Sequence, residues 1–309
     1  MTTAATEPDA SETAEKATDR PIVYVNGKML PKSQAAINVF DHGLLYGDGI
    51  FEGIRIYGGK IFKCRSHIDR LWRCAERTRL VIPVSPTEMI RIMRECVRAN
   101  EIVDGYIRLV ITRGVGNLGL NPFTCPTAGV ICIADQIRLF PPELYTKGMK
   151  VIVAERPRIP VQCLDPRIKS LNYLNNILAK VEAIDKGLLE VVMLNTDGYV
   201  AEGSGDNVFF VKNGTVVTPP PEAGILEGIT RQFVLETLCP QLGIAAEQRL
   251  FKLDELFGAD EVFLTGTAAE IIAVTQIDSH VISPGEGPIT SQLRTLFRDV
   301  VTSDDLPED

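Results

Sequence analysis

Histidine is scarce in this chain, and the motifs of several enzyme classes are missing from it. There are three histidines, His42, His67 and His280, and none lies in an HExxH arrangement, so we expect no metal centre. The chain has no GxSxG turn, which argues against a hydrolase with a Ser-His-Asp triad. Its glycine-rich segment at 47–53 is mis-spaced for a dinucleotide-binding loop, so a nicotinamide enzyme is disfavoured.

The seven cysteines are odd in number and include no CxxC pair. Disulfide frameworks are typical of short secreted chains with an even cysteine count, and structural zinc sites use closely spaced cysteine pairs. We therefore expect reduced thiols and a cytoplasmic location.

The chain also lacks a basic excess and any long hydrophobic run. Its net charge is -8, whereas nucleic acids and anionic membranes attract concentrated positive charge. Arginines cluster at 65–79 and 91–98, but acidic residues interrupt both clusters, which is typical of solvated helix faces. No segment has the unbroken apolar length of a membrane-spanning helix. We expect neither nucleic acid nor membrane as a partner, a disordered leader over residues 1–20 and an acidic tail over 303–309.

A length of 309 residues with 45% apolar residues predicts two domains with substantial cores. Hairpins mix with isolated helices rather than following a regular βαβ alternation, which favours an α+β fold. We expect a small α+β domain over residues 21–137, a linker over 138–148, where two prolines adjoin, and a large α+β domain over 149–309.

Hydrophobic periodicity locates the expected helices and strands. In the first expected helix, Ile68 and Leu71 face the core, and Arg70 lies on the opposite face, in solvent or in a cleft. In the third, Leu174, Leu178 and Val181 share one face, which we expect to be buried. Helices are predicted over 66–80, 87–100, 171–186 and 230–242, and strands over 22–25, 28–30, 53–57, 60–64, 106–112, 128–135, 150–154, 191–195, 208–211, 215–218 and 261–265.

Lys169 lies shortly before the helix expected over 171–186, between apolar neighbours. A lysine that is partly removed from water there has a lowered pKa, which frees the neutral amine to form an imine. The alternative is a solvated lysine at a helix N-terminus, which is the better interpretation of an arbitrary lysine.

Glu202 is followed by glycines at 203 and 205, between a predicted strand and a hairpin. Glycines there let the backbone approach a flat ligand, and a carboxylate beside a pyridine nitrogen keeps that nitrogen protonated. A plain turn glutamate is an equally good interpretation of this segment alone.

Two segments have the character of phosphate cradles, 228–230 at a helix start and 265–270 after a strand. Free backbone N–H groups with nearby hydroxyls suit a phosphate dianion, and Arg70 could supply a compensating cation. An ordinary helix start and an ordinary turn would account for the same residues.

The order of these segments along the chain resembles that of the class IV (fold-type IV) aminotransferases, which depend on pyridoxal 5'-phosphate. The resemblance covers about residues 21–282. It rests on the segments Phe40–Arg55, His67–Leu71, Tyr106–Arg108, Lys169, Tyr199–Asn207, Gly228–Arg231 and Thr265–Glu270.

The resemblance implies the two-domain α+β fold of the D-amino-acid aminotransferase type and a role for each matching residue. Lys169 would form the Schiff base with the cofactor and shuttle the proton, Glu202 would pair with the pyridine nitrogen, and Tyr173 would approach the phenolic oxygen. The phosphate would be held by Arg70, Ile229, Thr230 and Thr267. The substrate site would be lined by Tyr46, Phe51, Gly53, Tyr106, Arg108, Thr267 and Ala268.

The branched-chain group of this family is the best match, which implies transamination of Leu, Ile and Val with 2-oxoglutarate and an active site completed by a partner subunit in a homodimer. Residues 168–172 are more similar to D-amino-acid aminotransferases, and Asp206 stands where the branched-chain group more often has glutamate. A D-amino-acid aminotransferase, an aminodeoxychorismate lyase of the same fold and a catalytically silent scaffold protein are the alternatives.

Overall fold

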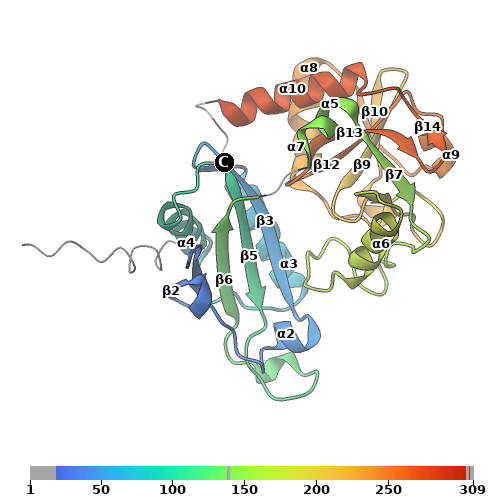
Figure 1. Ribbon diagram of the computed structural model, residues 1–309. Helices are drawn as coiled ribbons and strands as arrows, with labels where there is room; N and C mark the ends of the chain where they lie inside the picture. Colours follow the sequence, from blue (N-terminus) through green and yellow to red (C-terminus); the bar gives the residue numbers. More distant parts are fainter. Residues whose placement is uncertain (1–18, 138–139, 304–305, 307–309) are drawn as a thin grey trace, which may run out of the picture.

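A computed structural model describes residues 19–137, 140–303 and 306, and divides their strands between two sheets that lie side by side (Figure 1). Residues 1–18, most of the expected leader, lie outside the described residues, as does most of the expected tail. The mixture of helices with two sheets confirms the α+β prediction, whereas the exact domain boundaries stay a prediction.

The first sheet has six antiparallel strands in the order β2-β1-β6-β5-β3-β4. Helix α3 packs on β3, and helix α4 packs on β6 and β1, because each helix buries one apolar stripe. In α3 this stripe includes Ile68 and Leu71, as predicted. The bounds are β1 Ile22–Val25, β2 Lys28–Pro31, α2 His42–Tyr46, β3 Gly49–Tyr57, β4 Lys60–Ile61, α3 Cys64–Arg77, α4 Pro86–Ala99, β5 Gly105–Thr112 and β6 Gly129–Asp135, with short 3-10 turns at Lys32–Gln34 and Pro122–Thr124.

The second sheet is mixed, in the order β11-β10-β9-β12-β13-β7-β8, and β14 pairs with β13. Helices pack on this sheet in two separate hydrophobic clusters. One cluster includes α5 and α9, and the other includes α10 and the helical run that starts with α7. The bounds are α5 Pro142–Lys147, β7 Met149–Val153, α6 Leu174–Asp185, β8 Val191–Val192, β9 Asn207–Lys212, β10 Thr215–Thr218, a 3-10 turn Pro221–Ala223, α7 Ile229–Phe233, a π-helix Val234–Leu238, α8 Cys239–Leu242, β11 Ala246–Gln248, α9 Leu253–Phe257, β12 Glu261–Gly266, β13 Glu270–Ile277, β14 His280–Val281 and α10 Pro288–Thr302.

Helix α6 corrects the prediction made for residues 171–186. It begins at Leu174, and it buries the small or polar residues Asn176, Ala179 and Ala183. Leu174, at 64% exposure, and the other large apolar residues of the helix point to solvent, so the expected core face was wrong. The physical reason is close packing: alanines bring the helix near Ile152, Val191 and Met193, and the Asn176 amide donates a hydrogen bond to the Ser204 carbonyl oxygen at 2.8 Å.

Three further segments differ from the sequence-based expectations. The segment predicted as a linker carries helix α5, in which Tyr145 is buried and a proline at the first helical position suits the helix start. Residues 138–139 of that segment lie outside the described residues. Strand β13 and helix α10 were not predicted at all, although α10 has buried apolar residues at the helical spacing of Leu293, Phe297 and Val301.

Candidate active site

Lys169 lies in an extended segment that is fastened to strand β3. The Phe51 N–H donates to the Lys169 carbonyl oxygen at 2.9 Å, and the Leu171 N–H donates to the Gly49 carbonyl oxygen at 2.9 Å. On the other side, the Lys169 N–H donates to the Sγ of Cys74 in α3 at 3.4 Å. The backbone of Lys169 is therefore held from two directions, while its side chain is half-buried.

The amine of Lys169 lies among aromatic side chains. Its Nζ donates to the Tyr173 hydroxyl at 3.1 Å and lies 4.6 Å from the centre of the Phe51 ring. Phe51 and Tyr173 meet edge to face, with ring centres 5.0 Å apart. Tyr173 therefore contacts Lys169, and three residues separate the two in the sequence.

Arg70 is buried and paired with a carboxylate that the sequence did not single out. Its Nε and Nη2 donate to the two oxygens of Glu52 at 2.8 and 2.7 Å, and the Nδ1 of His67 lies 2.7 Å from Glu52 Oε2. Burial alone would raise the pKa of Glu52, but Arg70 and His67 lower that pKa far below its ordinary value. Burial lowers the pKa of His67, which favours the neutral ring that donates to the carboxylate.

Arg70 also connects the first sheet to the candidate phosphate cradle of the second. Its Nη1 donates to the carbonyl oxygen of Glu227 at 2.8 Å, directly before the start of α7. A guanidinium has five N–H donors, and these contacts use three, so two remain for a ligand. Ile229 and Thr230 are buried at the first positions of α7, where backbone N–H groups have no partner within the helix.

The other candidate cradle is the turn of the β12–β13 hairpin. Thr267 is half-buried and Ala268 exposed in this turn. Just before it, the Thr265 hydroxyl is buried without a hydrogen-bond partner in the described part of the chain. A Cβ on Gly266 would lie 2.0 Å from Asp206 Oδ1, so only glycine fits between the turn and that carboxylate. An orphaned donor at this place fits an anionic ligand group.

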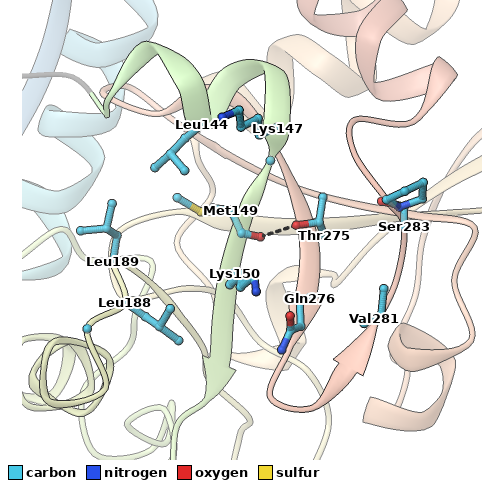
Figure 2. Close-up of a pocket in the computed structure, with 13 residues that line it drawn as sticks. Leu144, Lys147, Met149, Lys150, Leu188, Leu189, Thr275, Gln276, Val281 and Ser283 are labelled. Atoms are coloured by element: carbon cyan, nitrogen blue, oxygen red, sulfur yellow. Dashed lines mark hydrogen bonds between the residues drawn. The ribbon is translucent and has the colours of Figure 1, made fainter.

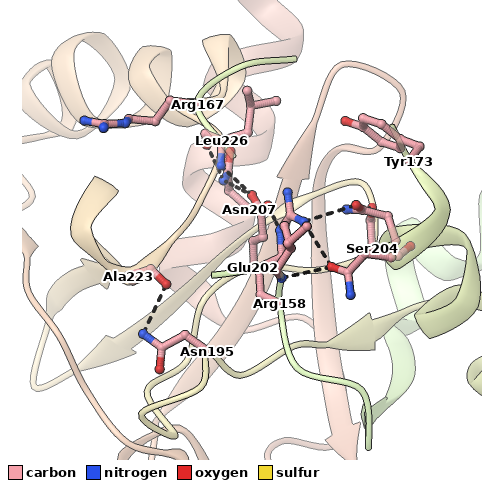
Figure 3. A network of polar contacts seen from close by, with 12 residues as sticks. Arg158, Arg167, Tyr173, Asn195, Glu202, Ser204, Asn207, Ala223 and Leu226 are labelled. Carbon is pink, nitrogen blue, oxygen red and sulfur yellow. Dashed lines mark hydrogen bonds and ion pairs between the residues drawn. The ribbon is translucent and has the colours of Figure 1, made fainter. Parts of the chain in front are cut away.

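Glu202 is buried at the centre of a polar network (Figure 3). Arg158 Nε donates to its Oε1 at 2.7 Å, and the Leu226 N–H donates to its Oε2 at 2.9 Å. Asn207 Nδ2 lies 3.3 Å from the same Oε2. Burial raises the pKa of the Glu202 carboxyl, and Arg158 opposes that rise. A carboxyl of raised pKa that still has acceptor capacity can share a proton with a ring nitrogen.

Four of the predicted substrate residues form one wall beside Lys169. Arg108 lies over two rings, with its guanidinium carbon 4.6 Å from the centre of Phe51 and 5.4 Å from that of Tyr106. Gly53 is opposite Arg108 in the β3–β5 pair, and a Cβ on it would lie 1.6 Å from the Tyr106 hydroxyl oxygen. Burial raises the pKa of Tyr106, which keeps its hydroxyl protonated.

Tyr46 is not brought to this group within the chain. It ends helix α2 and is 37% exposed, and its hydroxyl accepts a hydrogen bond from the Gly119 N–H at 2.9 Å. Its role as a substrate residue stays a prediction, as do the individual roles of the other site residues.

Sequence reasoning missed Glu52, His67 and Arg158. Glu52 could have been noticed, because a charged residue inside a wholly buried strand requires a partner. His67 and Arg70 are three residues apart on one helix, so both can reach that partner. Nothing local marks Arg158, whose position depends on the fold around Glu202. Among the described residues no group of three or more His, Cys, Asp or Glu could hold a metal ion.

The arrangement suits a flat, anionic ligand that carries a reactive carbonyl. It combines the half-buried amine of Lys169, the buried carboxyl of Glu202 and an anion site made of Arg70 and the start of helix α7. In the described part of the chain no helix is both long and apolar enough to cross a membrane.

Comparisons with known proteins agree with this geometry. The family model described as "Amino-transferase class IV" matches residues 49–277. A protein of Methanocaldococcus jannaschii, provisionally assigned as a branched-chain-amino-acid aminotransferase, is 47% identical over 91% of this chain and 96% of its own length.

Solved structures of similar proteins extend the comparison. The branched-chain amino acid aminotransferase of Escherichia coli superposes with a TM-score of 0.89 at 32% identity, covering 93% of this chain and 97% of that one. The T.th. branched-chain enzyme with pyridoxamine 5'-phosphate gives a TM-score of 0.87 at 36% identity, covering 91% and 93%. With the family model spanning most of the sequence and these relatives aligned over nearly all of it, this chain belongs to the class IV aminotransferases.

Proposed function

We propose that this enzyme transfers the amino group of branched-chain L-amino acids (Leu, Ile and Val) to 2-oxoglutarate. The observation that carries the proposal is the amine of Lys169, which is half-buried, donates a hydrogen bond to Tyr173 and contacts the same Phe51 ring as Arg108. The similarity of the chain to branched-chain aminotransferases over nearly its whole length supports the same activity.

The cofactor is pyridoxal 5'-phosphate, whose ring, once bound, withdraws electrons from the substrate Cα and so acidifies its proton. Lys169 would bind its carbonyl carbon, and Glu202 its ring nitrogen. The phosphate would be held by the two remaining donors of Arg70, the N–H groups of Ile229 and Thr230, and Thr267. The relative crystallised with pyridoxamine 5'-phosphate supports this choice.

Lys169, Tyr173 and Glu202 each have a part in the proton transfers. The Nζ of Lys169 takes the proton from the substrate Cα and returns it at the cofactor C4′. Tyr173 holds that Nζ by a 3.1 Å hydrogen bond and would approach the phenolic oxygen. Glu202 holds the proton on the ring nitrogen by accepting its hydrogen bond as a carboxylate, a form that Arg158 favours from 2.7 Å.

Substrate selection follows from the wall beside Lys169. Phe51 offers an apolar surface for branched side chains, while Arg108 can pair with the distal carboxylate of glutamate or 2-oxoglutarate. Tyr106 and Gly53 shape the space between them, and Thr267 and Ala268 would approach the substrate from the β12–β13 turn.

A homodimer would complete the site. Residues 37–41, helix α2 and the loop at 113–125 form one apolar surface, since the Asp41–Val115 bridge and the His42 N–H to Gly114 carbonyl bond connect them. Large exposed apolar surfaces mark interaction sites. A second copy of the chain would bury this surface, and the Tyr46 of each subunit would then lie at the active site of the other subunit. The exposed residues of this α2 surface are Ile37, Val39, Phe40, Leu44, Leu45, Tyr46, Val115, Leu118, Leu120 and Phe123.

Light scattering tests the dimer. Leu118→Arg/Leu120→Arg should give a monomer of low activity, because Leu118 and Leu120 are 73% and 82% exposed and the substitution cannot disturb a core. Val103→Arg, at a 62% exposed position elsewhere, is the control and should remain dimeric. A dimeric, active Leu118→Arg/Leu120→Arg variant would mean that this surface has another use.

We also propose a cytoplasmic location, since all seven cysteines are free thiols. Cell fractionation checks it, and recovery from an extracytoplasmic fraction would contradict it.

Donor assays test the activity itself. Purified holoenzyme should form glutamate from 2-oxoglutarate with L-leucine, L-isoleucine and L-valine, and should use D-alanine poorly. Lys169→Ala should abolish this turnover while it leaves the circular dichroism spectrum unchanged. Preference for D-donors, or substantial turnover by Lys169→Ala, would refute the proposal.

A further inference from the structure

A second cavity opens on the domain that carries the larger sheet, and none of its lining residues belongs to the candidate active site (Figure 2). Its volume is about 530 Å³, within the range of small-molecule pockets. It is lined by Leu144, Lys147, Gly148, Met149, Lys150, Gly187, Leu188, Leu189, Thr275, Gln276, Val281, Ser283 and Pro284.

Several separate segments build this cavity. Met149 in β7 and Thr275 in β13 are nearly buried, and between them the Thr275 hydroxyl donates to the Met149 carbonyl oxygen at 3.3 Å. The register of the β7–β13 pair shifts at Thr275, a bulge of the kind that opens space beside a sheet. Leu144, Leu188 and other apolar side chains form the walls, so the cavity is suited to an apolar body.

The charges around the cavity are all of one sign. Lys147 and Lys150 line it, no acidic residue does, and yet the whole chain has 40 acidic against 32 basic residues. Within the described part of the chain neither lysine side chain makes a hydrogen bond or an ion pair, and both lysines are exposed. Two ammonium groups with no counter-ion beside an apolar wall attract an anion and repel a second ammonium.

These features select among small ligands. An amino acid brings an ammonium group that no carboxylate here can accept, so the amino substrates of the enzyme are disfavoured. A neutral apolar molecule leaves both lysines without a partner. A carboxylate with an apolar body and no amine meets the lysines with its head and the leucine walls with its tail.

We propose that this cavity is a second ligand site, separate from the active site, which binds an apolar monocarboxylate lacking an amino group. Lys147 and Lys150 bind the carboxylate, and the side chains of Leu144, Leu188 and Val281 contact the apolar part.

Calorimetric titration of the holoenzyme with octanoate, octanol and octylamine tests the proposal, because these probes share a tail and differ in the head group. Octanoate should bind most tightly and octylamine least. In Lys147→Glu/Lys150→Glu the octanoate affinity should fall roughly tenfold or more, since two favourable charge contacts become repulsive. The transaminase activity of this variant should be unchanged, which shows that it is folded.

Matched controls distinguish binding in this cavity from binding elsewhere on the protein. Lys28→Glu/Lys32→Glu makes the same change of net charge at exposed positions in and beside the first sheet and should bind octanoate as the wild type does. Arg108→Ala should also bind it normally, which distinguishes this cavity from the active site. Equal binding of all three probes, unchanged octanoate affinity in Lys147→Glu/Lys150→Glu, or loss of binding in Arg108→Ala would overturn the proposal.

Discussion

Replacing Glu52 by glutamine should destabilise the protein and loosen its hold on the cofactor. Glu52 is fully buried, and both of its oxygens accept short bonds from Arg70 and His67. Removing one partner of a buried ion pair costs about 3–5 kcal/mol, because the other charge is left uncompensated. Glutamine keeps the shape and one acceptor oxygen, so we expect a loss of about 3 kcal/mol, at the lower end of that range.

Denaturant unfolding of the apoenzyme measures this loss. Folded domains have a stability of roughly 5–15 kcal/mol, so Glu52→Gln should still fold. The midpoint of its unfolding transition should move to a clearly lower denaturant concentration. Glu88→Gln is the control, because Glu88 pairs with Arg91 at 2.8 Å on the exposed face of α4 and its loss should not move the midpoint. The affinity for pyridoxal 5'-phosphate should fall about tenfold, since the Glu52 carboxylate no longer fixes the orientation of the Arg70 guanidinium through Nε and Nη2.

The pH dependence of the unfolding free energy gives a second test of the same substitution. The folded-state pKa of Glu52 lies far below the ordinary value of 4.5, so the stability that its ionisation contributes is complete above pH 4.5. This contribution is lost as the pH falls from 4.5 toward the folded-state pKa. The difference in unfolding free energy between the wild type and Glu52→Gln should therefore be constant at neutral pH and should narrow below pH 4.5. An unfolding midpoint equal to that of the wild type, or a gap that widens in acid, would refute the reasoning.

Two further substitutions test the substrate wall. Arg108→Ala should raise the KM for 2-oxoglutarate by at least tenfold, as expected for a lost charge-assisted hydrogen bond, and should change that for leucine much less; equal losses would make Arg108 structural. Gly53→Ala should lower kcat/KM for leucine about tenfold or more, because its Cβ would displace the Tyr106 hydroxyl, only 1.6 Å away. Wild-type kinetics in Gly53→Ala would show that the Tyr106 position is not important.

Much of the local structure could be predicted from the sequence, because turn residues and apolar periodicity act over a few residues. The strands expected over 22–25 and 28–30 and the buried stripe of α3 all lie where the sequence predicts them. The direction in which α6 faces could not be predicted by the same rule. Its leucines form a regular stripe, but the chain buries the alanines instead, and that choice depends on strands β7 and β8 on either side of it in the sequence.

The candidate site was predictable only in part. Lys169 and Glu202 do not imply a chemistry by themselves, because a solvated lysine and a turn glutamate would explain them singly, and only their order among the other motifs of the chain led to the prediction. Arg158 was not predictable, because only the folded chain places its guanidinium 2.7 Å from Glu202. The pairing of Arg70 with Glu52 was also hidden, although it decides which donors of Arg70 remain for a phosphate.

The attachment of the cofactor to Lys169 is the central claim, and it can be measured directly. Holoenzyme reduced with borohydride and digested should give one peptide with the mass of a phosphopyridoxyl group, and fragmentation should place that group on Lys169. A label on any other lysine, or a protein that takes up pyridoxal 5'-phosphate but gives no labelled peptide, would contradict the account.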